Sequence, residues 1–152
     1  GTRGELVFTT LTKEAFPVVR YRTRDLTELL PGTARPGHRR IAKITGRNDD
    51  MIILRGVNLF PTQIEEIALE DPELSTHFIL ELTRKGKMDA LTVKIEPREG
   101  VSHEHVEQSV RTLQHHIKSR IGTSVGVEAV PHGSLPRSQG KLKRLYDLRD
   151  QA

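Results

Sequence analysis

The order of the hydrophobic patterns after residue 50 constrains the fold more than any other feature of the sequence. Met51–Leu54 is a short apolar run that predicts a buried strand. A helical pattern begins at Pro61, a residue type suited to the first turn of a helix. Two runs with alternating apolar residues follow, Phe78–Leu82 and Leu91–Ile95, and they predict a hairpin with one buried face.

The longest helix is predicted after this hairpin, from an N-cap at Ser102 to a stop at Gly122. Its apolar residues recur at helical spacings and form one stripe: Val106, Val110, Leu113, Ile117 and Ile121. A last alternating run, Val125–Ala129, predicts another strand. The order strand-helix-strand-strand-helix-strand indicates an α+β domain, with helices on one face of a mainly antiparallel sheet.

The residues before 49 predict strands only, at Leu6–Leu11, Phe16–Thr23 and Arg40–Thr45, with a loop at Pro31–Gly37. Three strands with no helix and few large apolar residues make a poor independent domain. We therefore interpret residues 1–48 as a β-rich segment from the end of a larger domain, followed by a second domain at 49–152.

The composition excludes several classes of function. The chain has no cysteine, which excludes disulfides, thiolate metal sites and a cysteine nucleophile. Its net charge of +4 is interspersed, and aromatic residues make up only 4% with no Trp, so neither indicates nucleic-acid binding. Because no apolar run approaches a membrane span and no signal-peptide pattern is present, we expect a cytoplasmic protein with no membrane partner.

Four of the histidines fall in or beside the long predicted helix: His103, His105, His115 and His116. Their spacing does not match HExxH, the motif that places two imidazoles one helical turn apart. The adjacent pair at 115 and 116 points roughly 100° apart on a helix, which does not suit one ion. We expect surface histidines and no metal site.

Three other segments carry residue types that suit nucleotide chemistry. Tyr21–Asp25 ends on a carboxylate that can accept hydrogen bonds from a ribose diol. Gly46–Pro61 places a polar turn where the two structural patterns meet, as a hinge requires. Ser134–Arg144 carries Lys141, a cation that can neutralise charge growing on a phosphoryl group. Taken singly, each also fits a plain structural role: a strand end, a turn or a solvated basic tail.

Together, in this order and spacing, the three segments resemble the last core motifs of the acyl-adenylate-forming superfamily. The finer resemblance is to its phenylacetate–coenzyme A ligase branch, and it extends from Gly4 to Arg149. The residues that carry it are Tyr21-Arg22-Thr23-Arg24-Asp25, the Gly46–Pro61 block with Gln63-Ile64-Glu65, and Pro136-Arg137-Ser138 with Gly140-Lys141.

The resemblance implies an ATP-dependent ligase that forms an acyl-AMP and then an acyl-CoA from phenylacetate or another aryl-acetate. Asp25 and Arg47 match residues that contact the ribose, and Asp49 matches the hinge of a rotating C-terminal domain. By the same resemblance, Gly56 matches a position in the loop that lines the pantetheine path in the thioester-forming state. Lys141 matches the lysine that bridges carboxylate and α-phosphate oxygens during adenylation.

The same resemblance implies the ligands and partners. These are ATP with Mg²⁺, bound mainly by the N-terminal domain, coenzyme A as co-substrate, an aromatic carboxylic acid, and the protein's own N-terminal domain. A homodimer of the full-length protein is left open. The phosphate loop, the magnesium motif and the acyl pocket of the family are absent from the chain, so we expect a C-terminal fragment that is inactive alone, with 49–152 as the mobile lid.

Two positions depart from the wider superfamily, and alternatives inside and outside that superfamily stay open. Arg24 stands where a glycine is usual, and Asn58 where many acyl-CoA synthetases have a phosphate-contacting arginine. The acid could be another aromatic or hydroxylated one, or the chain could come from a polysaccharide-linked homologue. A basic α+β module that binds RNA or protein is the alternative from another class. Against it, the alternation places Phe78 in the core, whereas an RNA-binding sheet needs exposed aromatics.

Overall fold

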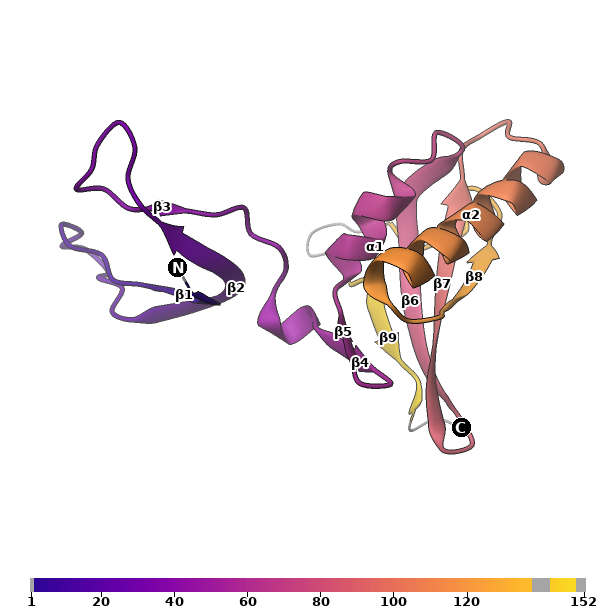
Figure 1. Cartoon of the computed structure of the whole chain (residues 1–152), viewed down its shortest axis with the longest axis horizontal. Coiled ribbons are helices and arrows are strands. Elements are labelled where there is room, and N and C mark those ends of the chain that lie inside the picture. The colour runs from indigo at the N-terminus through magenta and orange to yellow at the C-terminus, as the bar shows by residue number, and fades with distance from the viewer. Residues whose placement is uncertain (1, 138–142, 150–152) are drawn as a thin grey trace. The chain divides into compact units, whose positions relative to one another are not determined.

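The computed structural model describes residues 2–137 and 143–149, and it divides into two compact units, Gly1–Met51 and Ile52–Ala152 (Figure 1). The first unit is a three-stranded sheet followed by a turn of 3-10 helix. The second holds both α-helices and two further sheets. Neither of the helices within the described residues is long and apolar enough to cross a membrane.

The first unit is an antiparallel sheet in the order β1-β2-β3. Its elements are β1 (Arg3–Phe8), β2 (Tyr21–Leu30), β3 (Arg40–Ile41) and the 3-10 turn η1 (Asn48–Asp50). The three predicted strands exist, but their predicted bounds are wrong. Phe16 and Arg20 have positive φ angles of 58° and 48°, outside the extended region, and the second strand begins only after them, at Tyr21.

The second unit builds a small hairpin and a four-stranded sheet in the order β8-β7-β6-β9. β8 and β9 pair in parallel with β7 and β6, and β6 and β7 form the predicted antiparallel hairpin. The elements are β4 (Ile52–Leu54), β5 (Val57–Leu59), α1 (Pro61–Ala68), β6 (Leu74–Lys85), β7 (Met88–Pro97), α2 (His103–Ile121), β8 (Gly126–Ala129) and β9 (Leu145–Asp147). The predicted α+β class and element order are confirmed, whereas β5 and β9 were not predicted.

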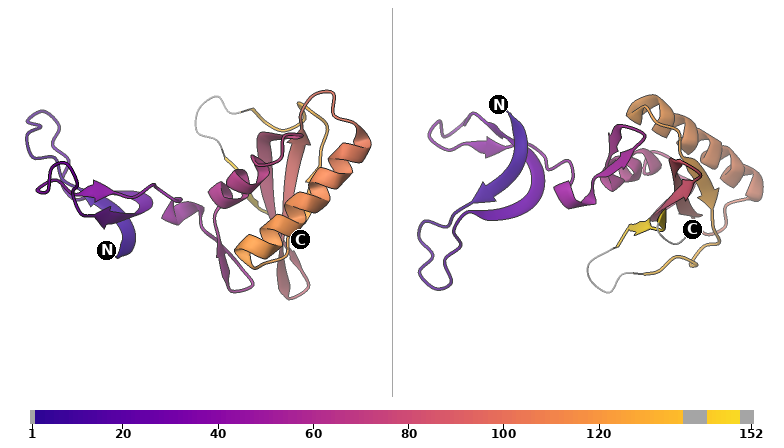
Figure 2. Two further views of the ribbon diagram at one scale, coloured as in Figure 1. Left: turned by 45° about the horizontal axis from the view of Figure 1, so that its top comes forward. Right: turned by 90° about the horizontal axis from the view of Figure 1, so that it is seen from below.

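The core of the second unit lies between the helices and one face of this sheet (Figure 2). Alternate residues of the hairpin face it, among them Phe78, which is 3% exposed as the alternation predicts. α2 begins where the Ser102 side chain accepts a hydrogen bond from the His105 N–H, and it ends at Gly122, whose φ is +86°. Both predicted ends of the long helix are therefore confirmed.

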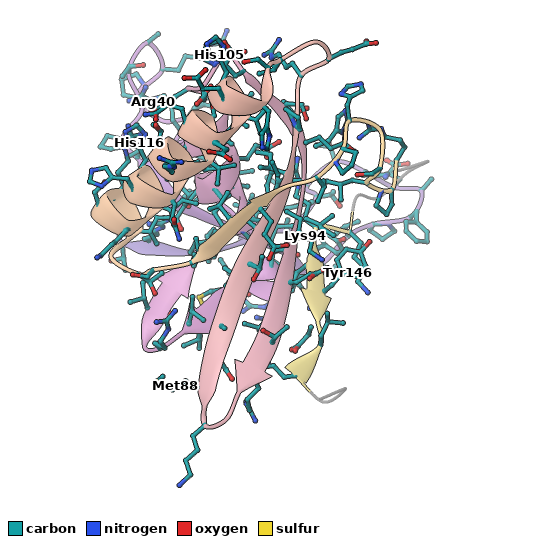
Figure 3. The ribbon with its side chains drawn as sticks, turned by 90° about the vertical axis from the view of Figure 1, so that its right-hand side faces the viewer. Arg40, Met88, Lys94, His105, His116 and Tyr146 are labelled. Carbon is teal, nitrogen blue, oxygen red and sulfur yellow. The ribbon has the colours of Figure 1, made fainter. Side chains whose placement is uncertain are left out.

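The opposite face of the four-stranded sheet carries polar side chains. Figure 3 shows Lys94 and Tyr146 on this side, and Met88 at the tip of the hairpin. The Lys94 ammonium lies 2.8 Å from a carboxylate oxygen of Glu81 on the neighbouring strand. This is the ordinary cross-strand ion pair of a solvated face, and it raises the pKa of Lys94.

Candidate functional site

The first unit brings Asp25 and Arg47 together from distant parts of the chain. The two residues form an isolated antiparallel bridge, supported by a 2.8 Å hydrogen bond from the Leu26 N–H to the Gly46 carbonyl. The Arg47 backbone is extended, with φ −108° and ψ 145°, and the chain turns into η1 directly after it. Asp49 of η1 is thus placed beside the end of the bridge.

The side chains of these residues form a cluster of opposite charges. The Nη2 atom of Arg47 donates to Asp49 Oδ2 at 3.0 Å, and its Nε lies 3.9 Å from Asp25 Oδ1. Arg24 Nη1 lies 3.6 Å from the same Asp49 oxygen. Arg47, Asp25 and Asp49 each keep about 30% of the side chain exposed, at 31%, 28% and 29%.

Some hydrogen-bond donors and acceptors of this cluster are not paired with other protein groups. Arg47 Nε is buried and has no hydrogen-bond partner among the described residues. A cavity of about 480 Å³ adjoins the cluster and is lined by Arg22, Arg24, Asn48 and Asp49. A partly exposed carboxylate beside a guanidinium can bind the two hydroxyls of a ribose: the carboxylate accepts hydrogen bonds from them, and the guanidinium donates to them.

Gly56 belongs to the second unit, in the two-residue turn between β4 and β5. Arg55 and Gly56 have φ angles of +51° and +83°, the paired left-handed conformation of a tight hairpin. A Cβ at Gly56 would meet no atom within 4 Å, so the glycine is required by the backbone and not by crowding. Arg55 Nη2 donates to the Ser124 carbonyl at 2.6 Å and ties this turn to the segment after α2.

Lys141 lies outside the described residues. The segment that precedes it in the described part of the chain, residues 133–137, is held by Glu96 of β7. Glu96 was not singled out from the sequence. Glu96 is fully buried, and its carboxylate accepts hydrogen bonds from the Gly133 N–H at 3.0 Å, the Leu135 N–H at 2.7 Å and Arg137 Nη2 at 2.7 Å. Burial raises the pKa of Glu96, but these three donors outweigh it and lower the pKa to about 2.

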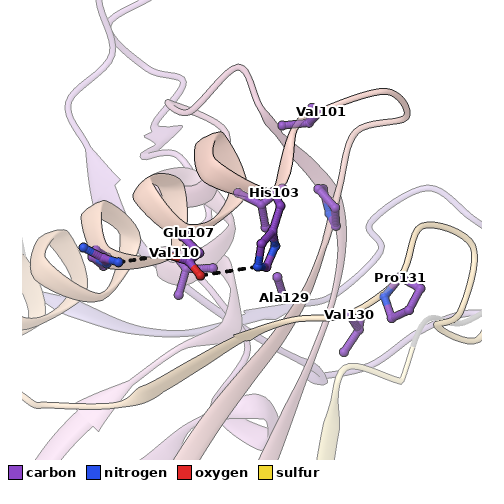
Figure 4. A pocket seen from close by; sticks show the side chains of 10 residues that line it. Val101, His103, Glu107, Val110, Ala129, Val130 and Pro131 are labelled. Carbon is purple, nitrogen blue, oxygen red and sulfur yellow. Dashed lines mark hydrogen bonds and ion pairs between the residues drawn. The ribbon is translucent and has the colours of Figure 1, made fainter.

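A surface groove of about 630 Å³ opens beside the start of α2 (Figure 4). Apolar side chains such as Val101 and Val130 line it, together with Glu107, whose carboxylate lies 3.4 Å from His103 Nε2 and 3.0 Å from Arg111 Nη2. The Glu107 carboxylate is therefore already paired with Arg111 on the helix surface. No group of three residues able to hold a metal ion occurs among the described residues.

Comparison with known proteins finds several phenylacetate-coenzyme A ligases among the relatives of this chain. The chain is 54% identical to the phenylacetate-coenzyme A ligase of Escherichia coli (strain K12) over 99% of its length. It spans only 35% of that relative. It also matches 2-hydroxyisobutyryl-CoA ligase in the postadenylation state, with a TM-score of 0.85 and 28% identity over 99% of this chain and 33% of the other.

The same 2-hydroxyisobutyryl-CoA ligase in its thioesterification state matches 99% of this chain and 32% of that chain, at 28% identity but with a TM-score of 0.64. The family model described as AMP-binding enzyme C-terminal domain matches residues 56–149. By that match, which covers most of the second unit, the chain belongs to the family of AMP-binding enzyme C-terminal domains.

Proposed function

We propose that this chain is the C-terminal part of an ATP-dependent aryl-acetate–CoA ligase, with phenylacetate as the acid. Residues 1–48 would complete the large N-terminal domain, and residues 49–152 would form the lid that rotates between two half-reactions. The observation that carries the proposal is the joining of Asp25, Arg47 and Asp49 in one charged cluster beside a turn. The relatives with ligase names support the same activity.

In this proposal the cluster holds the ribose of ATP and then of the acyl-adenylate. The Asp25 carboxylate accepts hydrogen bonds from the ribose hydroxyls, and the partly exposed guanidinium of Arg47 donates to one of them. Asp49, hydrogen-bonded to Arg47, connects the ribose site to the hinge. Asn58 is exposed on β5, and no phosphate role is proposed for it.

The surface of the first unit supports a role as part of a larger domain. All the buried hydrophobic residues of the described chain follow Met51, so the first unit has no apolar core among them. Many of its large apolar side chains are instead exposed: Val7, Phe8, Leu11, Phe16, Val19, Tyr21, Leu29, Ile41 and Ile44. A surface this apolar is typical of a segment that packs against more protein, here the protein's own N-terminal domain.

Rotation of the lid would let one active site carry out both adenylation and thioester formation. During adenylation two anions meet, and a cation such as Lys141 stabilises the charge that grows between them. A lysine left in place would obstruct the CoA thiol, so the lid turns about Asp49 and presents the Gly56 turn to the pantetheine arm. ATP, Mg²⁺ and most contacts to the acid are assigned to the N-terminal domain of the whole protein, which we place in the cytoplasm.

The test is ATP–pyrophosphate exchange by the full-length protein with phenylacetate, benzoate and indoleacetate, beside the 152-residue chain alone. We expect exchange with phenylacetate in the whole protein and none in the chain. Lys141→Ala should abolish most exchange and spare thioester formation from pre-made acyl-adenylate. Exchange with another acid would change the substrate and keep the mechanism, whereas no exchange with any acid in a folded protein would favour the binding module.

A further inference from the structure

The Glu96 carboxylate lies on a face of the sheet where a charged residue is normally solvated. Its neighbours Val93 and Ile95 point into the core, and Lys94, on the same face as Glu96, is partly exposed and paired with Glu81. Glu96 is nevertheless 0% exposed. It is buried because the segment 131–137, which follows β8, lies across it and supplies all three hydrogen bonds to its carboxylate.

The contacts with Glu96 take the place of secondary structure in this segment. Residues 131–137 form no helix and no strand, and alternate positions, Gly133, Leu135 and Arg137, direct their donors at the two carboxylate oxygens. Charge-assisted hydrogen bonds of this kind are stronger than neutral ones, and a buried ionised carboxylate is costly without them. The segment and Glu96 therefore hold each other in one arrangement.

A second carboxylate holds the chain where the described residues resume. The Arg144 guanidinium pairs with Glu65 of α1 and lies 4.1 Å from the centre of the Phe78 ring. The Arg144 carbonyl also accepts a 2.7 Å hydrogen bond from the Leu80 N–H, directly before β9. Arg137 stands four residues before Lys141 and Arg144 three residues after it, so both flanks of the lysine are attached to the body of the second unit.

We propose that Glu96 is a positioning residue for Lys141: by fixing the segment that ends at Arg137, it sets where the ammonium group is delivered during adenylation. This inference rests on the proposed function of Lys141. Catalysis by a placed cation is sensitive to its position, because a shift of about 1 Å can cost on the order of a hundredfold in rate. Glu96 acts through the chain and need not touch the substrate.

The test is Glu96→Gln in the full-length protein, with the two half-reactions measured separately. The amide keeps the shape of the side chain but loses the charge that pairs with Arg137. We expect ATP–pyrophosphate exchange with phenylacetate to fall about tenfold or more, with thioester formation from pre-made acyl-adenylate within about twofold of the wild type. Glu81→Gln, which breaks the other carboxylate pair on the same face, is the matched control and should leave both rates unchanged.

A double-mutant cycle separates positioning from stability. In a Lys141→Ala background, Glu96→Gln should cause no further loss of exchange, because Glu96 acts only through the lysine. Equal losses in both half-reactions, or losses that multiply in the double variant, would overturn the proposal and leave the function of Lys141 intact. Absence of exchange in the wild type would instead reject the proposed function itself. If Glu96→Gln does not fold, Arg137→Gln replaces it and is judged by the same criteria. This variant alters the other partner of the pair, whose side chain is 42% exposed and not buried.

Discussion

Arg24 adopts a left-handed backbone, with φ +66°, within strand β2. An L-residue in this region costs roughly 1–2 kcal/mol, which glycine avoids. The pairing of β1 and β2 shifts register at this point, between Glu5 and Val7. The glycine expected here in the wider superfamily thus has a backbone reason. In this chain the Arg24 N–H donates to the Glu5 carboxylate at 3.2 Å, and the Arg24 guanidinium faces Asp49.

Glu96 makes the stability of the chain depend on pH. Its pKa of about 2 in the folded protein lies below the ordinary value of 4.5, so ionisation stabilises the fold above about pH 4.5. That stabilisation, on the order of 3 kcal/mol, is lost as the pH falls from 4.5 toward 2. We expect the free energy of unfolding of the 152-residue chain, measured with urea, to fall as the pH is lowered through this window. The fall should be smaller for Glu96→Gln. Parallel pH profiles for the two proteins would contradict the role of the carboxylate.

The elements with strong periodicity were predictable, and those made by distant contacts were not. α2 follows from its apolar stripe and its two end signals, Ser102 and Gly122. β5 was missed because it is only three residues long, directly after the Arg55–Gly56 turn. β9 follows a basic stretch typical of a solvated tail, and it becomes a strand only by pairing with β6.

The candidate site divides in the same way. Asp25, Arg47 and Asp49 were proposed as site residues from the family resemblance that their motifs carry together, and the structure places them in one cluster. Their roles toward a nucleotide stay predictions. Glu96 was missed because it reads as an ordinary outward position in an alternating strand. The segment that covers it comes about 40 residues later, so no local pattern announces its burial.

The β4–β5 turn gives a test of the pantetheine path at the scale of one element. Gly56→Asn adds a side chain where space is open, and Asn tolerates a positive φ better than most residues. We expect the chain to fold with a loss of no more than about 1 kcal/mol, because Asn costs little more than Gly in this conformation. In the full-length protein, thioester formation should slow several-fold while ATP–pyrophosphate exchange stays near the wild-type rate.

Gly86→Asn is the matched control for that substitution. Gly86 has φ +63° in the β6–β7 turn, and a Cβ there also meets nothing within 4 Å. The same change in this second hairpin should leave both half-reactions unchanged. Normal thioester formation by Gly56→Asn, or an equal effect of the two variants, would remove Gly56 from the CoA path.

At the scale of the molecule, the two units differ in how they are stabilised. Residues from Ile52 onward bury a continuous apolar core, and α1 and α2 share it with the four-stranded sheet. The first unit relies on strand pairing and on ion pairs such as Arg22 with Glu5. A lid that turns as one body needs an internal core of this kind, and a segment of a larger domain does not.

Under the proposed function, the turn η1 near the end of the first unit is the segment that would absorb a rotation of the lid. Asp49→Pro in the full-length protein fixes the φ angle of residue 49 near −65°, a value typical of a 3-10 turn. The proline also restricts the backbone conformations open to the preceding residue, Asn48. We expect exchange to stay within a few-fold of the wild type and thioester formation from pre-made acyl-adenylate to fall about tenfold or more, because only that step follows the rotation. Asp49→Ala removes the contact with Arg47 without fixing φ, and it should spare thioester formation. Normal thioester formation by Asp49→Pro would place the hinge elsewhere, and an equal loss in Asp49→Ala would assign the effect to the carboxylate.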